Sequence, residues 1–228
     1  MSLVITQIAE CNRWYTESIN RGETVLEGLW LVHPDDEMCE AFEERFAGLP
    51  NVRIIKGRFE DLEPHDCFVT AGNAYGIMTA GIDAAVINRF GESFMEHVQH
   101  RIMGQYFGEQ PVGTAFLLST DDPSLPFIAH APTMRVPCNI EGTDKVYAAT
   151  WASLLAIVAH NQTASQRIEV VAFPAMGTGF GRMPYSEAAR QMAVAYRNLL
   201  DPPHRLDWEF VMDRQLAICY DGKRQVVR

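Results

Sequence analysis

The stretch FPAMGTGFGRMP, residues 173–184, places three glycines between an apolar run and a segment with helical spacing. The central loop consists of Gly177, Thr178, Gly179, Phe180 and Gly181. Such a loop offers successive backbone N–H groups near a helix N-terminus, with no Cβ to keep an anion away. It indicates either a phosphate or pyrophosphate site or a tight turn in which glycine only supplies positive φ angles.

The two most familiar phosphate motifs do not fit this loop. No GxxxxGK followed by Ser or Thr occurs, which disfavours a P-loop NTPase. GTGFG lacks the last spacing of GxGxxG and lies near the end of the chain, which disfavours a dinucleotide-binding Rossmann domain.

The composition describes an ordinary globular protein with an acidic balance. The chain has 228 residues, of which 47% are hydrophobic and 21% charged. Its formal charge of −10 argues against duplex nucleic acid as a partner, because that binding depends on Lys and Arg neutralising phosphates. A small phosphate-bearing ligand remains compatible, since backbone amides can hold phosphate without a cationic side chain.

The cysteine count and the apolar runs bear on compartment. Five widely spaced cysteines, without a CxxC pair, predict no disulfide framework and no structural zinc site. No basic-then-apolar N-terminus and no run long enough to span a membrane is found in this sequence. We therefore expect a cytoplasmic protein without a membrane partner, a metal or a cofactor.

Apolar strands and amphipathic helices alternate along the chain, which predicts a mostly parallel sheet with helices on both faces. We expect strands at 29–33, 52–57, 67–73, 112–120, 127–133 and 168–174, with a final strand within 210–220. Helices are expected at 34–46, from about 82, at 95–103, 146–160 and 186–200. Residues 1–26 are expected to form an N-terminal helical extension and residues 27–228 the α/β domain. A ligand would lie at the carboxyl ends of the strands.

A second small-residue loop, within DCFVTAGNAYGIMTAGIDAAV at 66–86, follows the strand expected at 67–73. Asn73 could exchange hydrogen bonds with sugar hydroxyls. Asp83 falls at a helix start, where the dipole stabilises a carboxylate. It could also lie at the mouth of the cleft and orient a water.

These residues resemble the macrodomain family. DCFVTAGNAYGIMTAGIDAAV is similar to the family's strand, NAAN-like turn, glycine-rich loop and helix, and FPAMGTGFGRMPYSEAARQMA resembles its second glycine-rich loop. IIKGRFEDLE and APTMRVP stand where the family has an earlier strand-and-acid segment and a loop typical of a bacterial subgroup. The resemblance covers about 27–221 and implies a three-layer α/β/α fold with a mixed, mostly parallel sheet.

The resemblance also implies roles for individual residues. Asn73 would contact the distal ribose, and Asp83 would stand where hydrolytic members carry an acid. Tyr220 is a loose match for an aromatic wall beside the adenine, with a core tyrosine as the alternative. The residues matched to ribose and diphosphate contacts are Thr79, Ala80, Gly81, Ile82, Gly177, Thr178, Gly179, Phe180 and Gly181.

Three positions depart from the family pattern. Thr70 replaces the first Asn, Thr79 and Ala80 replace glycines, and Arg58 stands where an acid usually accepts a hydrogen bond from adenine. Arginine cannot accept that bond. Glu60 or Asp61 could substitute for it.

The function implied is binding of ADP-ribose or a close derivative, with hydrolysis of ADP-ribosyl linkages or O-acyl-ADP-ribose as a further expectation. In the catalytic hypothesis Asp83 positions or activates a water while Asn73 fixes the ribose. A noncatalytic interaction module and a phosphatase acting on a phosphorylated ADP-ribose-like nucleotide stay open as alternatives. His97 and His100 are expected to be exposed helix residues and not metal ligands, and His130 a structural residue.

Overall fold

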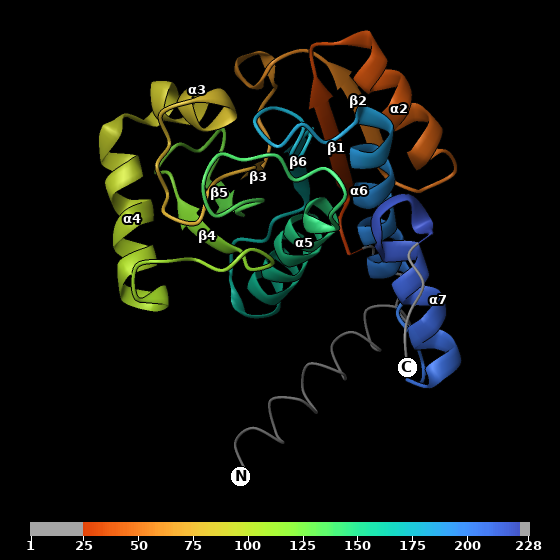
Figure 1. Cartoon of the computed structure of the whole chain (residues 1–228). Helices are drawn as coiled ribbons and strands as arrows, with labels where there is room; N and C mark the ends of the chain where they lie inside the picture. The colour runs from red at the N-terminus through yellow and green to blue at the C-terminus, as the bar shows by residue number, and fades with distance from the viewer. Residues whose placement is uncertain (1–24, 224–228) are drawn as a thin grey trace.

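The computed structural model describes residues 25–223, and Figure 1 shows their arrangement. The helical extension expected at residues 1–26 lies almost entirely outside the described residues and stays a prediction. The strands are β1 (Gly28–His33), β2 (Val52–Lys56), β3 (Cys67–Thr70), β4 (Phe116–Ser119), β5 (Phe127–His130) and β6 (Val170–Pro174).

The six strands form one mixed sheet in the order β2-β1-β6-β3-β5-β4. The pairs β1–β2, β1–β6, β3–β6 and β3–β5 are parallel, whereas β4 runs antiparallel to β5. The predicted mixed, mostly parallel sheet is thus confirmed. Because β2, β1, β6, β3 and β5 run the same way, their carboxyl ends meet at one edge.

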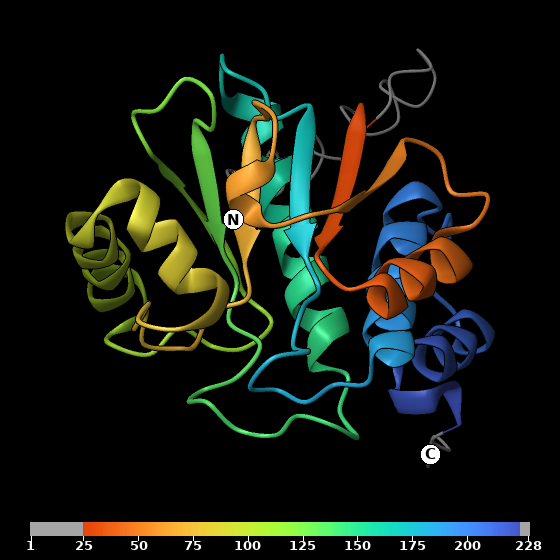
Figure 2. The same cartoon turned by 90° about the horizontal axis from the view of Figure 1, so that it is seen from above.

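Helices cover both faces of this sheet (Figure 2), which completes the predicted three-layer α/β/α architecture. The helices are α2 (Asp36–Phe46), α3 (Gly81–Phe90), α4 (Glu92–Tyr106), α5 (Lys145–Thr163), α6 (Tyr185–Leu200) and α7 (Trp208–Ile218), with 3₁₀ turns η1 (Phe59–Asp61) and η2 (Tyr220–Gly222). None of the helices in the described residues is long and apolar enough to cross a membrane.

Side-chain alternation along the strands explains the two layers of core. On β6, Val171 and Phe173 enter the core beneath α2, α5 and α6, whereas Ala172 enters the core beneath α3 and α4. All three side chains are fully buried. A strand with apolar residues on both faces belongs in the middle of a sheet covered on both sides.

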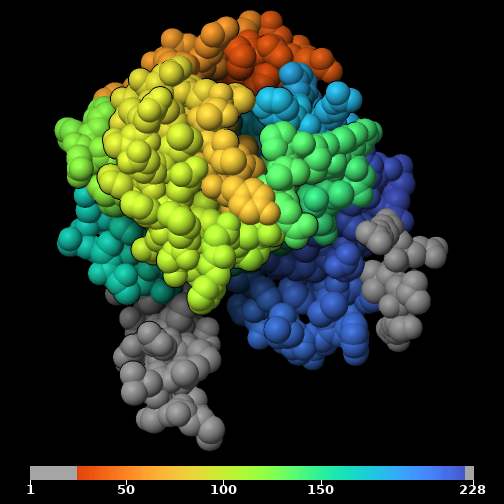
Figure 3. All heavy atoms as spheres, turned by 60° about the vertical axis from the view of Figure 1, so that its left-hand side comes forward, coloured from red at the N-terminus to blue at the C-terminus, as the bar shows by residue number. Residues whose placement is uncertain are grey.

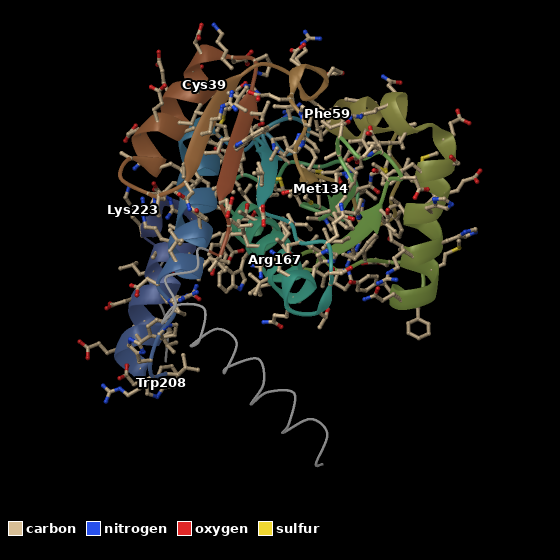
Figure 4. The ribbon with its side chains drawn as sticks, turned by 180° about the vertical axis from the view of Figure 1, so that it is seen from behind. Cys39, Phe59, Met134, Arg167, Trp208 and Lys223 are labelled. Carbon is tan, nitrogen blue, oxygen red and sulfur yellow. The ribbon has the colours of Figure 1, made fainter. Side chains whose placement is uncertain are left out.

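The C-terminal prediction was wrong, because residues 208–218 form helix α7 and not a strand. The side chain of Asp207 accepts a hydrogen bond from the Phe210 amide at 2.9 Å, which caps the helix N-terminus. The last strand in the chain, β6, is already paired on both sides, so this segment finds no place beside it. In Figure 4, Trp208 of α7 lies far from Phe59 and Met134.

Candidate functional site

A cleft of about 500 Å³ opens at the carboxyl edge of the sheet. In Figure 3 it is the hollow between the amber loop before α3, the green segment after β5 and the blue loop before α6. The residues predicted to contact the ribose and the diphosphate, together with Asp83, all line this cleft: Asn73, Thr79, Ala80, Gly81, Ile82, Asp83, Gly177, Thr178, Gly179, Phe180 and Gly181. The two small-residue loops therefore face one shared cavity.

The loop before α6 owes its shape to its glycines. Gly177 has φ +75°, and a Cβ there would meet Val146 at 2.8 Å. A Cβ on Gly181 would collide with the Gly177 carbonyl oxygen. Within the described chain, the amides of Gly179, Phe180 and Gly181 donate to no protein acceptor. This loop therefore presents three consecutive N–H groups at the cleft.

The N-terminus of α3 adds a second set of free amides. Its cap residue, Ala80, has no side chain that could accept a hydrogen bond, so the first-turn amides lack the usual partner. In the described part of the chain, the N–H groups of Gly81, Ile82 and Asp83 have no acceptor. An uncapped helix N-terminus with a positive dipole end is a good place for an anion.

Asn73 shapes the loop before α3 from within. Its Nδ2 donates to the Ile77 carbonyl at 2.8 Å, and its Oδ1 accepts from the amides of Tyr75 at 3.1 Å and Ile77 at 3.3 Å. An asparagine side chain has two N–H donors and one oxygen with two lone pairs. One N–H group of Asn73 therefore remains for a ligand.

Asp83 is an acid in a costly position. Its side chain is only 5% exposed, and burial raises its pKa to about 7, although the neighbouring Thr70 hydroxyl acts in the opposite direction. Its Oδ1 is buried without a hydrogen-bond partner among residues 25–223. The other oxygen, Oδ2, is not among the buried unpaired atoms of the described residues, so Oδ2 is the oxygen that reaches the cleft.

Most of the other residues that line the cleft were missed by the sequence reasoning. Arg58 and Glu60, singled out from the sequence, both line it. Arg58 is the only lysine or arginine among the cleft residues of the described chain. The missed lining residues include Val32, His33, Pro34, Thr133, Met134, Val136 and Pro137, most of which follow the strands expected at 29–33 and 127–133. The sequence did offer a signal for them, because ligands of such sheets bind at the carboxyl ends of the strands.

Several other candidates lie elsewhere. Tyr220 is not a cleft residue, and it packs against the core beneath α5 and α6. His97 and His100 are exposed on α4. His130 is fully buried and bonds Gln110 Oε1 at 2.7 Å. In the residues described, no three His, Cys, Asp or Glu side chains gather as a metal site would require.

Comparison with known sequences assigns the chain to a protein family. The family model described as Macro domain matches residues 69–192, more than half of the chain. An uncharacterized protein of Aquifex aeolicus is 31% identical over 147 residues, which are 64% of this chain and 81% of that protein.

Solved structures resemble the fold at low sequence identity. The macrodomain of Mycobacterium tuberculosis DarG has a TM-score of 0.52 at 19% identity, covering 63% of this chain and 88% of that one. A mutant Oceanobacillus iheyensis macrodomain with ADPR has a TM-score of 0.50 at 15% identity, covering 75% of this chain and 78% of that one. By its family match, this chain belongs to the macrodomain family.

Proposed function

We propose that the cleft binds ADP-ribose or a close derivative. The observation that carries the proposal is that six backbone amides, at 81–83 and 179–181, have no acceptor within residues 25–223 and belong to loops that line one cavity. Such amides suit a diphosphate, because they bring partial positive charge without a desolvated cation. The cavity volume lies within the range of small-molecule sites, and a related macrodomain has been solved with ADPR.

We further propose that Asp83 serves hydrolysis of an ADP-ribosyl linkage. A carboxylate at the cleft wall can hold a water for attack on the anomeric carbon of the distal ribose. For an ester-linked ADP-ribosyl group, the water oxygen bonds to that carbon and gives one proton to Asp83, while the bond to the leaving oxygen breaks and the leaving group departs as a carboxylate. For O-acetyl-ADP-ribose, the same water would bond to the acetyl carbonyl carbon, the acyl C–O bond would break, and the proton taken by Asp83 would pass to the departing ribose oxygen. Asn73, with one N–H group to spare, would orient the ribose.

Calorimetry with ADP-ribose, AMP and NAD tests the binding proposal. ADP-ribose should bind, whereas AMP should bind much more weakly because it lacks the diphosphate and the second ribose. Silence toward all three ligands would remove the proposal and favour a noncatalytic interaction module.

Gly179→Glu is the matched variant. A Cβ on Gly179 meets no atom of the described residues within 4 Å, so the substitution places a carboxylate in the cleft without disturbing the backbone. We expect the affinity for ADP-ribose to fall by about tenfold or more, about 1.4 kcal/mol, with an unchanged melting temperature.

Turnover is tested separately from binding. Wild-type protein should release ADP-ribose from a modified protein or from O-acetyl-ADP-ribose, and Asp83→Ala should abolish release while ADP-ribose affinity stays within a few-fold. No release by the wild type would leave a binding protein. Release that requires a divalent metal would favour the phosphatase alternative.

A further inference from the structure

Behind the wall of the cleft lie three buried polar atoms that no protein group satisfies. They are Asp83 Oδ1, Thr70 Oγ1 and His130 Nε2, each without a hydrogen-bond partner in the described chain. Thr70 and His130 are fully buried. An unpaired buried polar group costs about 1–3 kcal/mol, so three together call for a partner that satisfies them.

The three side chains are neighbours on one face of the sheet. Thr70 and His130 are register partners on the parallel strands β3 and β5, so both side chains point toward α3 and α4. Asp83, in the first turn of α3, lies close enough to Thr70 for the hydroxyl to lower its pKa. The His130 Nε2 atom would lie 2.5 Å from a Cβ on Gly72, two residues beyond Thr70.

The protonation of His130 follows from its other nitrogen. Gln110 Nε2 donates to the carbonyls of Thr114 and His130, so Gln110 Oε1 is the acceptor that faces Nδ1 at 2.7 Å. Nδ1 therefore carries the hydrogen. Burial lowers the pKa of His130 to about 4, so the ring is neutral and Nε2 is a bare acceptor.

Counting the available hydrogens then shows which kind of hydrogen-bonding partner these three atoms need. When Asp83 is ionised, its carboxylate and His130 Nε2 are two acceptors, and the Thr70 hydroxyl supplies one hydrogen for both. One water balances the count, because it accepts from Thr70 and donates one hydrogen to Asp83 and one to His130. A buried water in a protein usually makes about three hydrogen bonds, which is the number proposed for this one.

We propose that Thr70, Asp83 and His130 together hold one buried water behind the cleft, and that Thr70 and His130 are positioning residues for Asp83. The water anchors the inner oxygen, Oδ1, and so fixes the carboxylate with Oδ2 directed to the cleft. Hydroxyl and imidazole thus set the direction of the acid without touching the ligand. The water site stands independently, whereas its catalytic consequence rests on the proposed hydrolysis.

Two measurements on the wild type test the water site without reference to activity. A crystal structure that shows ordered water should contain one within hydrogen-bond distance of all three atoms. In ¹⁵N NMR spectra the His130 Nε2 resonance should lie upfield of a free imidazole acceptor. A direct protein bond to Nε2, or no water among the three atoms, overturns the proposal.

Substitutions then test the positioning role. Thr70→Val keeps the shape but removes the hydroxyl, so the His130 Nε2 resonance should move downfield and kcat should fall about tenfold with KM unchanged. Thr70→Ser should restore both. Thr150→Val is the control, since that buried hydroxyl donates to the Val146 carbonyl within α5, on the other face of the sheet.

The outcomes separate the two proposals. If the wild-type protein shows no turnover but its His130 Nε2 resonance still responds to Thr70→Val, the water site stands and only the hydrolase proposal is refuted. A resonance that is unchanged in Thr70→Val refutes the shared water, whatever the activity. Equal losses of kcat in Thr70→Val and Thr70→Ser refute the positioning role.

Discussion

The carboxyl group of Asp83 is buried where its negative charge is unfavourable, and this fixes how stability should depend on pH. Its folded pKa of about 7 lies above the ordinary value of 3.8. Between these two pH values the folded chain therefore holds a proton that the unfolded chain has released. Stability should therefore be highest below about pH 4 for this group and decline as pH rises to about 7, by on the order of 4 kcal/mol.

Asp83→Asn should remove this pH-dependent loss, because asparagine is neutral at every pH. Thermal unfolding should show the variant more stable than wild type at pH 8 and nearly equal at pH 4. Asp122→Asn is the control of opposite sign, since Arg89 and Ser124 lower the pKa of Asp122 to about 2. That carboxylate stabilises the fold above its ordinary pKa, so its loss should destabilise at pH 8. An Asp83→Asn variant less stable than wild type at pH 8 would contradict the buried charge.

The same pKa predicts the pH dependence of any turnover. If Asp83 accepts a proton from water, only its ionised form is active, and kcat/KM should rise with pH to a plateau above about 7. A pH–rate profile on O-acetyl-ADP-ribose measures this. A rate that falls through the same range would instead assign Asp83 as a proton donor.

At the scale of the element, two glycines of the loop before α6 should respond in opposite ways to the same substitution. Gly181→Ala places a Cβ on the Gly177 carbonyl and 2.9 Å from Ile140, so we expect a loss of about 1–3 kcal/mol. Gly179→Ala meets open space and should change stability by less than about 0.5 kcal/mol. Urea unfolding of both variants decides this, and equal effects would contradict the loop geometry.

Arg190 of α6 is one of the side chains that tie helix α7 to the domain. The Arg190 guanidinium donates to the carbonyls of Ala217 at 2.6 Å and Cys219 at 2.8 Å, and it pairs with the nearly buried Glu187. Arg190→Met would free α7 and leave Glu187 without its cation, which costs about 3–5 kcal/mol for a buried pair.

Hydrogen exchange should detect that release as faster exchange across residues 208–222 in Arg190→Met. Lys223→Ala is the control, because its ion pair with Asp221 is exposed and contributes little. Unchanged exchange in Arg190→Met would mean that apolar contacts alone hold the helix.

The elements show how far local pattern reaches. Alternation and helical spacing predicted the succession of strands and helices along the chain up to α6, because each of these elements buries one face against its neighbours in the core. The pattern failed at 208–218, where no side chain in α7 is buried and periodicity therefore carries no signal. Strand ends were also misjudged: β3 stops at Thr70 and not at residue 73, although Asn73 still forms an isolated parallel bridge with Met134.

The cleft was predictable for a similar reason. Glycines at positive φ and a helix whose first turn contains Asp83 are local features, so the sequence displays them. The contributions of His33, Val136 and Thr133 depend on which strand ends meet, and that is set by the β1-β6-β3-β5 neighbours of the sheet. The pairing of Thr70 with His130 across 60 residues is likewise a property of register and not of any motif.

For the whole molecule, charge and ligand have the same sign. The chain carries −10, the proposed ligand is a diphosphate, and Arg58 is the only lysine or arginine lining the cleft within the described chain. Backbone amides supply a local attraction that salt screens little, whereas the repulsion from distant carboxylates is screened within about 10 Å at 0.1 M salt. Net binding should therefore owe little to counterion release.

We thus expect the affinity for ADP-ribose to stay constant or to rise slightly when salt increases from about 20 mM to about 200 mM. Calorimetry across that range measures it, with Arg58→Gln as the variant that isolates the one cleft cation. A site built on cationic side chains would lose affinity steeply over the same range. A tenfold loss of affinity in the wild type that is absent in Arg58→Gln would show that Arg58, and not the backbone amides, binds the phosphate. Only a side-chain cation would then account for the salt dependence.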